Sequence, residues 1–490
     1  MPNYPTTDSS DTNTHLVLLV AINARYSHSS LAMRSLIANM PDIPTALLEC
    51  EIKQSPEIIA EKIISTNPTI LALGVYIWNR TLLEKLIPLL RTQLPQCKII
   101  LGGPEISYDT SSPLAQLADC VICGEAEEFL PQICQNIITK RPVAHIQHAP
   151  PPDLSTIRLP TEAYTDADLQ HRNIYIETSR GCPCACRFCL SSLTCGVRYY
   201  PLDAIFAHLD QLCGRGARQF RFVDRSFNLA GERAVKILEY FLHKNVPDLF
   251  LHLEIVPEFL SAALRETILR FPPGALHIET GIQSLNEKVL KRINRPARPE
   301  AALEGIHWLT NTAGATVHAD LIAGLPGETL DSFIQGFEAL YRTGPAEIQL
   351  GILKHLPGTD LHQEPSMHFS RQPPYEVLAS DAMTASELDQ IRRFAAHWER
   401  IVNRNHFPNT MKLLLQGSHI WNTFDACSLV VAQKHGIHGM GLVEIARELH
   451  TFLQTRDMAP AETIRNALAQ DYLAEGRRIN LPTFLRPDGQ

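Results

Sequence analysis

Short apolar runs alternate with amphipathic stretches along most of this chain, and this alternation constrains its fold more than any other feature. The first series of runs comprises Leu16–Ile22, Thr45–Glu49, Ile70–Ile77, Lys98–Leu101 and Cys120–Cys123. Between them, Pro56–Ser65 and Thr81–Leu94 carry apolar residues at helical spacing. Apolar strands separated by helices are typical of a parallel sheet covered on both faces. Residues 15–138 are therefore predicted to form a doubly wound, flavodoxin-like α/β domain that binds its ligand at the carboxyl ends of the strands.

A second alternating region extends over residues 170–364. Its expected strands are Ile174–Thr178, Gln219–Val223, Phe250–Ile255, Leu276–Thr280, Val317–Ile322 and Glu347–Leu353. Its expected helices include Leu202–Cys213, Gly231–Lys244 and Thr329–Tyr341. Six strand–helix units are too few for an eightfold barrel. An incomplete (β/α)6 barrel is predicted, with its active site at the C-terminal ends of the strands.

The remaining segments lack this alternation. Residues 1–14 are polar and are expected to form a disordered tail. Residues 139–169 have little periodicity and are predicted to be a semi-rigid linker; their prolines are Pro142, Pro150, Pro151, Pro152 and Pro160. Residues 365–490 are predicted to form a helical C-terminal domain, with amphipathic helices at Ala385–Asn403, Leu442–Thr455 and Ala461–Glu475.

Composition restricts the class of protein. The chain has 490 residues, with 44 Lys and Arg against 52 Asp and Glu, and a formal net charge of −8. This balance gives no electrostatic reason to expect nucleic acid as a partner. The first apolar run, Leu16–Ile22, is far shorter than a membrane span and has no basic residues before it, so neither a signal peptide nor a membrane span is expected. We expect a cytoplasmic protein, in which the 12 cysteines are buried, catalytic or metal-bound.

Four cysteines are crowded directly after the first expected strand of the barrel, in the sequence Cys182-Pro183-Cys184-Ala185-Cys186-Arg187-Phe188-Cys189. Cys182, Cys186 and Cys189 have the spacing CxxxCxxC, which suits three irons of a [4Fe–4S] cluster and leaves the fourth iron open. A structural zinc site would need a second ligand pair, and none is evident. Cys184 could be a fourth ligand only by crowding an already tight loop. The remaining alternative is a group of buried cysteines that binds no metal.

With this loop, the chain resembles the radical S-adenosylmethionine (SAM) superfamily. Later motifs follow in the order of that family: Phe222–Asn228, Glu254, Glu279–Ser284, Asp320–Glu328 and Leu356–Thr359. The resemblance implies cluster ligands at Cys182, Cys186 and Cys189. It implies SAM contacts from Phe188, Asp224, Glu254, Gln283, Ser284 and Ile322. Asp224-Arg225-Ser226 stands where the family usually has Gly-Gly-Glu for the methionine amine.

The first region resembles the cobalamin-binding domain of cobalamin-dependent radical SAM enzymes. Gly-rich turns that follow strands carry this resemblance, because glycine lets the backbone approach a ligand closely. The residues implied to contact cobalamin are Asn23, Arg25, His28, Gly102, Gly103, Pro104, Gly124 and Glu125. The cobalt-ligating motif DxHxxG is missing after the first strand, so the lower face of cobalt is expected to lack a protein imidazole. The alternatives are His28 as the ligand and a degenerate domain that has lost cobalamin. The C-terminal region resembles a domain of unassigned function attached to one subgroup of these enzymes.

These resemblances imply a cobalamin-dependent radical SAM enzyme with a [4Fe–4S] cluster, SAM and cobalamin as cofactors. The leading hypothesis is a methyltransferase that acts on an unactivated carbon of a metabolite or other small molecule, with a reducing partner such as flavodoxin or ferredoxin. A radical cyclase, oxidase or rearrangement enzyme is the alternative within enzymes, and a corrinoid and cluster sensor or carrier is the alternative outside them. A methylthiotransferase is disfavoured, because its second cluster would need N-terminal cysteines, and those present lie mainly in apolar stretches: Cys50, Cys97, Cys120, Cys123 and Cys134.

Overall fold

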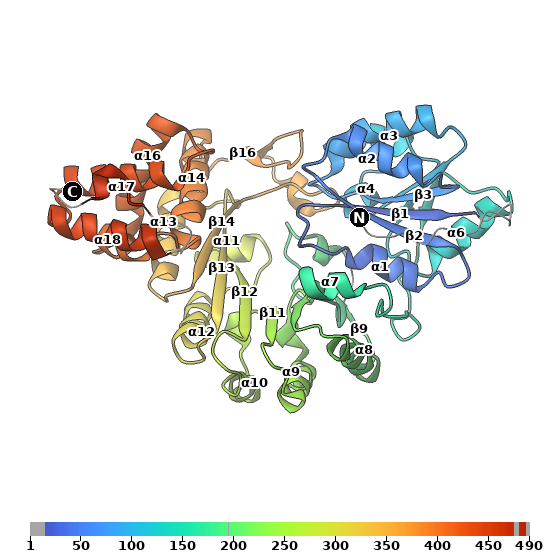
Figure 1. Ribbon diagram of the computed structural model, residues 1–490, viewed down its shortest axis with the longest axis horizontal. Helices are drawn as coiled ribbons and strands as arrows, with labels where there is room; N and C mark the ends of the chain where they lie inside the picture. The colour runs from blue at the N-terminus through green and yellow to red at the C-terminus, as the bar shows by residue number, and fades with distance from the viewer. Residues whose placement is uncertain (1–14, 195, 475–479, 487–490) are drawn as a thin grey trace.

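The computed structural model describes residues 15–194, 196–474 and 480–486. The tail expected at residues 1–14 lies outside them, as does Glu475, the end of the last expected helix. Three parts follow one another along the chain: an N-terminal α/β domain, a partial barrel and a helical domain (Figure 1). The α/β domain and the helical domain lie at opposite ends of the molecule, with the barrel between and below them in this view.

The N-terminal sheet is parallel throughout and has the strand order β2-β1-β3-β4-β5-β6. Its strands are β1 (Val17–Asn23), β2 (Thr45–Glu51), β3 (Ile70–Gly74), β4 (Lys98–Gly102), β5 (Cys120–Cys123) and β6 (Ile146–His148). Its helices are α1 (Leu31–Ala38), α2 (Pro56–Ser65), α3 (Arg80–Gln93), α4 (Pro104–Ser107), α5 (Pro113–Gln116) and α6 (Phe129–Ile138). Both faces of the sheet are buried, with α2 and α3 on one face and α1 and α6 on the other (Figure 1). The predicted doubly wound domain is confirmed.

The segment predicted to be a linker contains regular structure. Within residues 139–169, β6 pairs with β5 as a sixth strand, and α7 (Asp166–His171) begins with a capping box formed by Thr165 and Asp168. These two elements were not predicted from the sequence, because the prolines around β6 hide its three residues. Pro142 and Pro150 lie outside its three residues, so every N–H that the edge strand needs is retained.

The second sheet is the partial barrel. Its parallel strands have the order β14-β13-β12-β11-β10-β7, without pairing between β14 and β7. They are β7 (Ile174–Ile176), β10 (Gln219–Phe222), β11 (Phe250–Glu254), β12 (Leu276–Gln283), β13 (Thr316–Ala323) and β14 (Glu347–Ile352). Helices α8 (Leu202–Gly214), α9 (Glu232–Lys244), α10 (Ala262–Ile268), α11 (Glu287–Arg292), α12 (Pro299–Asn311) and α13 (Leu330–Tyr341) connect them. The predicted incomplete (β/α)6 barrel is confirmed.

Burial alternates along the barrel strands. In β13, Val317, Ala319 and Leu321 are buried against the helices, whereas Thr316, His318, Asp320 and Ile322 are only half-buried. Successive side chains of a strand point to opposite faces, so the second set faces the barrel interior. The same alternation in β12 places His277, Glu279 and Gly281 on that interior face. The interior of the barrel is therefore polar.

The helical part contains α14 (Ala385–Trp398), α15 (Pro408–Leu414), α16 (Ile420–His435), α17 (Leu442–Thr455) and α18 (Ala461–Ala474). It packs on the edge strand of the barrel, where the Asn403 carboxamide accepts from the N–H of Ile348 at 3.3 Å and donates to its carbonyl at 3.1 Å. This contact protects the free edge of β14. In the segment before α14, a two-stranded hairpin of β15 (His368–Phe369) and β16 (Val377–Ala379) extends towards the N-terminal domain (Figure 1). Among the helices in the described ranges, none combines the length and apolarity required to cross a membrane.

Candidate active site between the two sheets

A cavity of about 1080 Å³ lies where the carboxyl ends of both sheets meet. The two domains touch there, because the loop after β1 pairs with the residue before β7 through His28 and Asn173. The cavity exceeds the range of about 300–1,000 Å³ that is usual for ligand pockets. Most residues predicted to contact cobalamin line it: Asn23, His28, Gly102, Gly103, Pro104, Gly124 and Glu125. Arg25 is exposed and lies outside that lining, so its role stays a prediction.

Two glycine turns form part of the cavity wall. Gly103 has φ +102, and a Cβ there would lie 2.7 Å from the carbonyl oxygen of Val75. Gly124 has φ +100, and its Cβ would lie 2.8 Å from the carbonyl oxygen of Ala149. Residues other than glycine are strained at such φ values. The turns bring bare backbone to the ends of β4 and β5, which suits a large planar ligand such as a corrin.

His28 is attached to the barrel. Its Nδ1 lies 2.5 Å from the phenol oxygen of Tyr175 on β7, and the two rings are parallel to within 13°. Burial lowers the pKa of His28, and the charges of Arg221, Arg25 and Arg172 lower it further. The imidazole is therefore held neutral and bonded to the barrel. This contact between the domains was not predicted from the sequence.

The cysteine loop leaves the barrel through a hairpin of β8 (Ser179–Gly181) and β9 (Val197–Tyr199). Cys186 is buried, and its sulfur lies 4.0 Å from the Arg295 guanidinium. The loop is held against the end of α11, since the Arg187 N–H donates to the Ile293 carbonyl at 3.0 Å and the Asn294 amide donates to the Ala185 carbonyl at 2.8 Å. Hydrogen bonds to the turn after α11 thus fix the loop at residues that lie between its three predicted ligands.

These cysteines suit a cluster better than a single ion. A hydrogen bond from Cys184 lowers the pKa of Cys182 to about 6 despite burial, and the Arg295 charge also favours the thiolate. In the described part of the chain, no three His, Cys, Asp or Glu side chains converge on one metal position. Three thiolates of a cubane bind three different irons and need not converge. We therefore take the residues present to fit a [4Fe–4S] cluster, with Cys184 as a hydrogen-bond partner in the loop.

Asp224 anchors the entrance of this loop. Its carboxylate is buried and accepts from the Thr178 N–H at 3.0 Å, the Thr178 hydroxyl at 2.6 Å and the Ser179 hydroxyl at 2.5 Å. Both carboxylate oxygens are thus used by the chain itself. A contact from Asp224 to SAM stays a prediction beside this observed structural contact.

Carboxylates gather on the interior face of the barrel. Glu254 on β11 lies opposite Glu279 on β12, and Gly281 lies opposite Asp320 on β13. Burial raises the pKa of Glu254 to about 7, although Arg225 pairs with it at 3.2 Å. Burial, followed by repulsion from Glu279 and Glu254, raises the pKa of Asp320 to about 8. The Oδ1 atom of Asp320 is buried and has no hydrogen-bond partner among the described residues, so it suits a hydroxyl donor from a ligand.

Asp320 begins one of the sequence motifs but was not predicted as a site residue. The alternation of β13 was the signal that could have found it, because positions 318, 320 and 322 share the interior face. Ile322, the predicted residue on that face, is half-buried. Phe188, the predicted aromatic contact in the cluster loop, packs half-buried against the barrel core.

The end of β12 carries the other predicted SAM residues. Gln283 has φ +70 at a register shift between β12 and β13, and its Oε1 is buried without a partner in the described residues. Ser284 is buried and donates to Glu328 at 2.6 Å, and burial raises the pKa of Glu328 to about 7. Ser284 is therefore engaged by the chain, whereas Gln283 retains an acceptor for a ligand.

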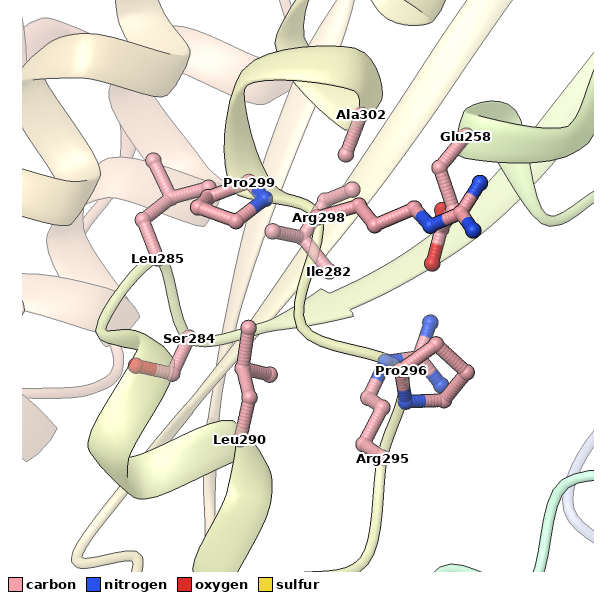
Figure 2. A pocket seen from close by; sticks show the side chains of 10 residues that line it. All are labelled: Glu258, Ile282, Ser284, Leu285, Leu290, Arg295, Pro296, Arg298, Pro299 and Ala302. Carbon is pink, nitrogen blue, oxygen red and sulfur yellow. The ribbon is translucent and has the colours of Figure 1, made fainter.

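Arg295 was also missed. It lines a small pocket of about 10 Å³, room for about one water molecule, in which Glu258, Arg295 and Arg298 gather on one side and Ser284, Leu285 and Leu290 on the other (Figure 2). Its guanidinium donates to the Gly281 carbonyl and reaches Cys186, so a cation lies beside both the cluster loop and the end of β12. A sequence motif gives no signal for this, because the contact depends on the turn after α11.

The N-terminal cysteines lie in surroundings that disfavour metal ligation. Burial raises the pKa of each of these thiols, to about 11 for Cys97 and Cys120 and to about 12 for Cys134, and it also raises the pKa of Cys50 and Cys123. Metal ligation requires thiolates, which such surroundings disfavour. Their place in the apolar core agrees with the sequence interpretation.

Family models match all three parts of the chain. The radical SAM superfamily matches residues 176–340, and the B12 binding domain matches residues 17–134. The chain is a radical SAM enzyme with a B12-binding domain. Its cofactors are therefore a [4Fe–4S] cluster, SAM and cobalamin. A family described as "Protein of unknown function (DUF4080)" matches residues 363–490 of this radical SAM enzyme.

Solved structures with the same architecture agree with this assignment. TsrM, a radical S-adenosylmethionine methyltransferase from Kitasatospora setae solved with tryptophan substrate and a SAM analogue, has a TM-score of 0.60 at 14% identity, over 76% of this chain and 81% of that one. OxsB, a cobalamin-dependent S-adenosylmethionine radical enzyme solved with aqua-cobalamin and SAM, has a TM-score of 0.64 at 12% identity, over 95% of this chain and 79% of that one. At such identities the likeness shows a shared fold.

Curated relatives are methylthiotransferases. A tRNA-2-methylthio-N(6)-dimethylallyladenosine synthase from Herpetosiphon aurantiacus is 22% identical over 291 residues, which cover 57% of this chain and 63% of that protein. A ribosomal protein uS12 methylthiotransferase, RimO, from Myxococcus xanthus is 28% identical over 168 residues, which cover 32% of this chain and 35% of that protein. The radical SAM enzyme thus spans less than two thirds of the length of these relatives.

Proposed function

We propose that this radical SAM enzyme methylates an unactivated carbon of a small-molecule substrate and consumes SAM in two chemically different ways. The observation that carries the proposal is the single cavity described above. Its wall includes the Gly102–Pro104 turn and Gly124 of the B12-binding domain, and also Gly181 and Leu190 beside the cluster cysteines. Methyl transfer to a substrate carbon needs the cofactors and the substrate in one water-poor space.

The cofactors would supply electron transfer to SAM from the cluster and a methyl carrier in cobalamin, while the chain binds, orients and excludes water. Cys182, Cys186 and Cys189 would hold the cluster. Arg295 would pair with the SAM carboxylate, since its guanidinium lies 4.0 Å from the Cys186 sulfur. Asp320 and Gln283 would bond the ribose hydroxyls through oxygens that have no partner in the described residues.

The substrate region would lie in the same cavity, between the glycine turns of the B12-binding domain and the residues beside the cluster cysteines. Tyr175, Glu177 and Arg225 line the cavity from the barrel side. We expect the substrate there, because a group near both cofactors can react with each in turn. A small electron-carrier protein such as flavodoxin or ferredoxin would reduce the cluster.

Product counting tests this proposal against a cyclase or oxidase. Anaerobic, reduced holoenzyme would be given SAM with a deuterated methyl group and a metabolite extract, and the products would be counted by mass spectrometry. We expect one S-adenosylhomocysteine for each deoxyadenosine and methionine, and a metabolite that gains the labelled methyl group. Deoxyadenosine without S-adenosylhomocysteine or labelled metabolite would contradict methyl transfer. A sensor would form neither product, and the Cys186→Ala variant provides the matched blank.

A further inference from the structure

One arginine joins the cluster loop to the B12-binding domain. Arg180 lies on β8, two residues before Cys182. Its guanidinium donates to Glu125 at 2.7 Å, to Glu127 at 2.5 Å and to Glu177 at 2.9 Å. Glu125 and Glu127 follow β5 in the B12-binding domain, and Glu177 follows β7 in the barrel. A single side chain therefore contacts carboxylates from both domains.

This group is shielded from water. The Arg180 side chain is 12% exposed and that of Glu127 is 8% exposed. Burial opposes the charge of Arg180, but Glu177 and Glu127 raise its pKa above the ordinary value. A guanidinium has several donors in a rigid plane and can bind more than one carboxylate at fixed angles, which an ammonium group does not reproduce. The geometry at Arg180 is thus defined more tightly than at an exposed ion pair.

Other contacts hold the carboxylates themselves. Tyr200 donates to Glu177 at 3.1 Å, and Ser35 on α1 donates to Glu127 at 3.0 Å. Arg198 on β9, the partner strand of β8, also donates to Glu125. Arg180, Glu125, Glu127 and Glu177 all line the large cavity. The network therefore lies in the wall between the glycine turn at Gly124 and the start of the cluster loop.

A second arginine network joins the same domains away from this loop. Arg34 on α1 donates to Glu49 at 2.8 Å and to Asp168 on α7 at 3.0 Å. Its side chain is 2% exposed, so it is at least as buried as Arg180. Asp168 belongs to the helix before β7 and not to the hairpin that carries the cysteines. Arg34 therefore provides a matched comparison for the effect of a buried ion pair between the domains.

We propose that Arg180 is a positioning residue that sets the separation and orientation of cobalamin and the iron–sulfur cluster. On one side it contacts the residues after β5, where the corrin turn Gly124–Glu125 lies. On the other side it lies on the strand that leads into Cys182. Displacement of either side moves one cofactor site relative to the other. The inference rests on the two cofactors and not on the proposed methyl transfer.

The experiment measures the distance between the cofactors directly. Holoenzyme would be reconstituted anaerobically with cluster and cobalamin and reduced so that cob(II)alamin and the paramagnetic cluster coexist. Pulsed electron paramagnetic resonance then reports their magnetic coupling. In Arg180→Gln we expect both cofactors at wild-type content but a shift in mean separation on the order of 1 Å, the displacement that commonly costs about 10²-fold in rate. Arg34→Gln should keep the wild-type coupling.

Glu127→Gln covers the case in which Arg180→Gln fails to fold. It keeps the hydrogen-bonding shape, removes one charge and leaves Arg180 paired with Glu125 and Glu177. We expect an intermediate change in coupling, and Arg180→Lys should not restore the wild-type distance. Unchanged coupling in Arg180→Gln, or in Glu127→Gln where the former does not fold, overturns the proposal. An equal shift in Arg34→Gln also overturns it, because domain contact in general would then set the distance. Methyl transfer is not measured, so failure here is distinct from failure of the proposed function.

Discussion

Tyr375 donates a hydrogen bond of 2.5 Å from its phenol to Oε1 of Glu105, although 270 residues separate them in the sequence. Glu105 follows the Gly102–Pro104 turn that lines the cavity, and it also pairs with Arg80 at 3.0 Å. Nearby, a Cβ on Gly358 would lie 2.7 Å from the Tyr108 ring. The segment between the last barrel strand and α14 is therefore attached to the B12-binding domain beside the Gly102–Pro104 turn.

Replacement of Tyr375 by Phe should loosen this attachment and speed cobalamin dissociation. Hydrogen bonds to charged groups contribute about 1.5–3 kcal/mol, and Arg80 still neutralises Glu105 in the variant. Hydrogen exchange of residues 366–379 and the rate of cobalamin loss measure the effect. Tyr240→Phe, which removes a 2.5 Å phenol bond to Asp210 outside the cavity, is the control. Equal rates of cobalamin loss from Tyr375→Phe and Tyr240→Phe would contradict the expectation.

Cysteine replacement tests the ligand assignment. Each of Cys182→Ala, Cys186→Ala and Cys189→Ala should abolish both the absorption of the reconstituted cluster and the reductive cleavage of SAM, because a cubane held by three thiolates is lost when one is removed. Cys184→Ala should leave both largely intact, since that thiol only hydrogen-bonds to Cys182. The assignment is wrong if Cys184→Ala removes the cluster and Cys186→Ala does not.

The Gly103 turn should be essential for cobalamin binding. In Gly103→Ala the new methyl meets the Val75 carbonyl at 2.7 Å, so the turn must move. Gly216→Ala is matched in conformation, with φ +100 against φ +102, but its Cβ has nothing within 4 Å. Both variants carry the cost of positive φ, about 1–3 kcal/mol. Only Gly103→Ala should also lose bound cobalamin, as judged from the absorption spectrum after gel filtration.

His28 should not ligate cobalt. Because its Nδ1 is bonded to Tyr175 across the domain boundary, we expect no nitrogen superhyperfine splitting in the electron paramagnetic resonance spectrum of the cob(II)alamin form. His28→Ala should leave that spectrum unchanged. Splitting in the wild type that disappears in the variant would make His28 the lower ligand.

The stability of the apoprotein should depend on pH through Asp320. Its pKa is raised from 3.8 to about 8, so the folded state keeps the proton that the unfolded state releases first. The contribution of the protonated Asp320 carboxyl to the free energy of unfolding is fully present below about pH 4, and it is lost as the pH rises through about 8. Asp320→Asn should therefore stabilise the apoprotein at pH 8 by about 2–5 kcal/mol, with little effect at pH 4.

Urea unfolding at the two pH values measures this difference. Asp389→Asn is the control, because that carboxylate is 73% exposed. If the gain in stability from Asp320→Asn were the same at both pH values, ionisation of the buried carboxyl would not be its cause.

The sheets could be predicted because the N-terminal strands are continuous apolar runs and the barrel strands alternate apolar with polar residues, patterns that do not depend on distant residues. Boundaries were less certain where a local signal conflicted with tertiary pairing. A glycine such as Gly281 usually indicates a turn. β12 nevertheless continues through Gly281 to Gln283, because β13 pairs with both residues across a register shift. β6 was missed because three residues between prolines carry no strand pattern until β5 offers them partners.

Some residues of the candidate site could likewise be predicted from local sequence, whereas others depend on tertiary contacts. The cysteine loop and the glycine turns carry local signals, since both need particular residue types at particular spacings. Asp320 and Arg295 carry weaker ones, because an acid on a strand or an arginine after a helix is common in any sequence. The place of Asp320 opposite Gly281 depends on strand register, and the contact of Arg295 with the cluster loop depends on the turn after α11.

The sequence by itself determined two parallel α/β units, a cluster loop after the first barrel strand and a helical C-terminal part, because hydrophobic periodicity and ligand spacing act over a few residues. Only the tertiary structure decided which carboxylates face one another in the barrel, how His28 bonds to Tyr175 and how Arg180 joins the domains. These contacts link residues far apart in the chain. Their charges interact only after folding has brought them together and removed the water between them, so no local pattern records them.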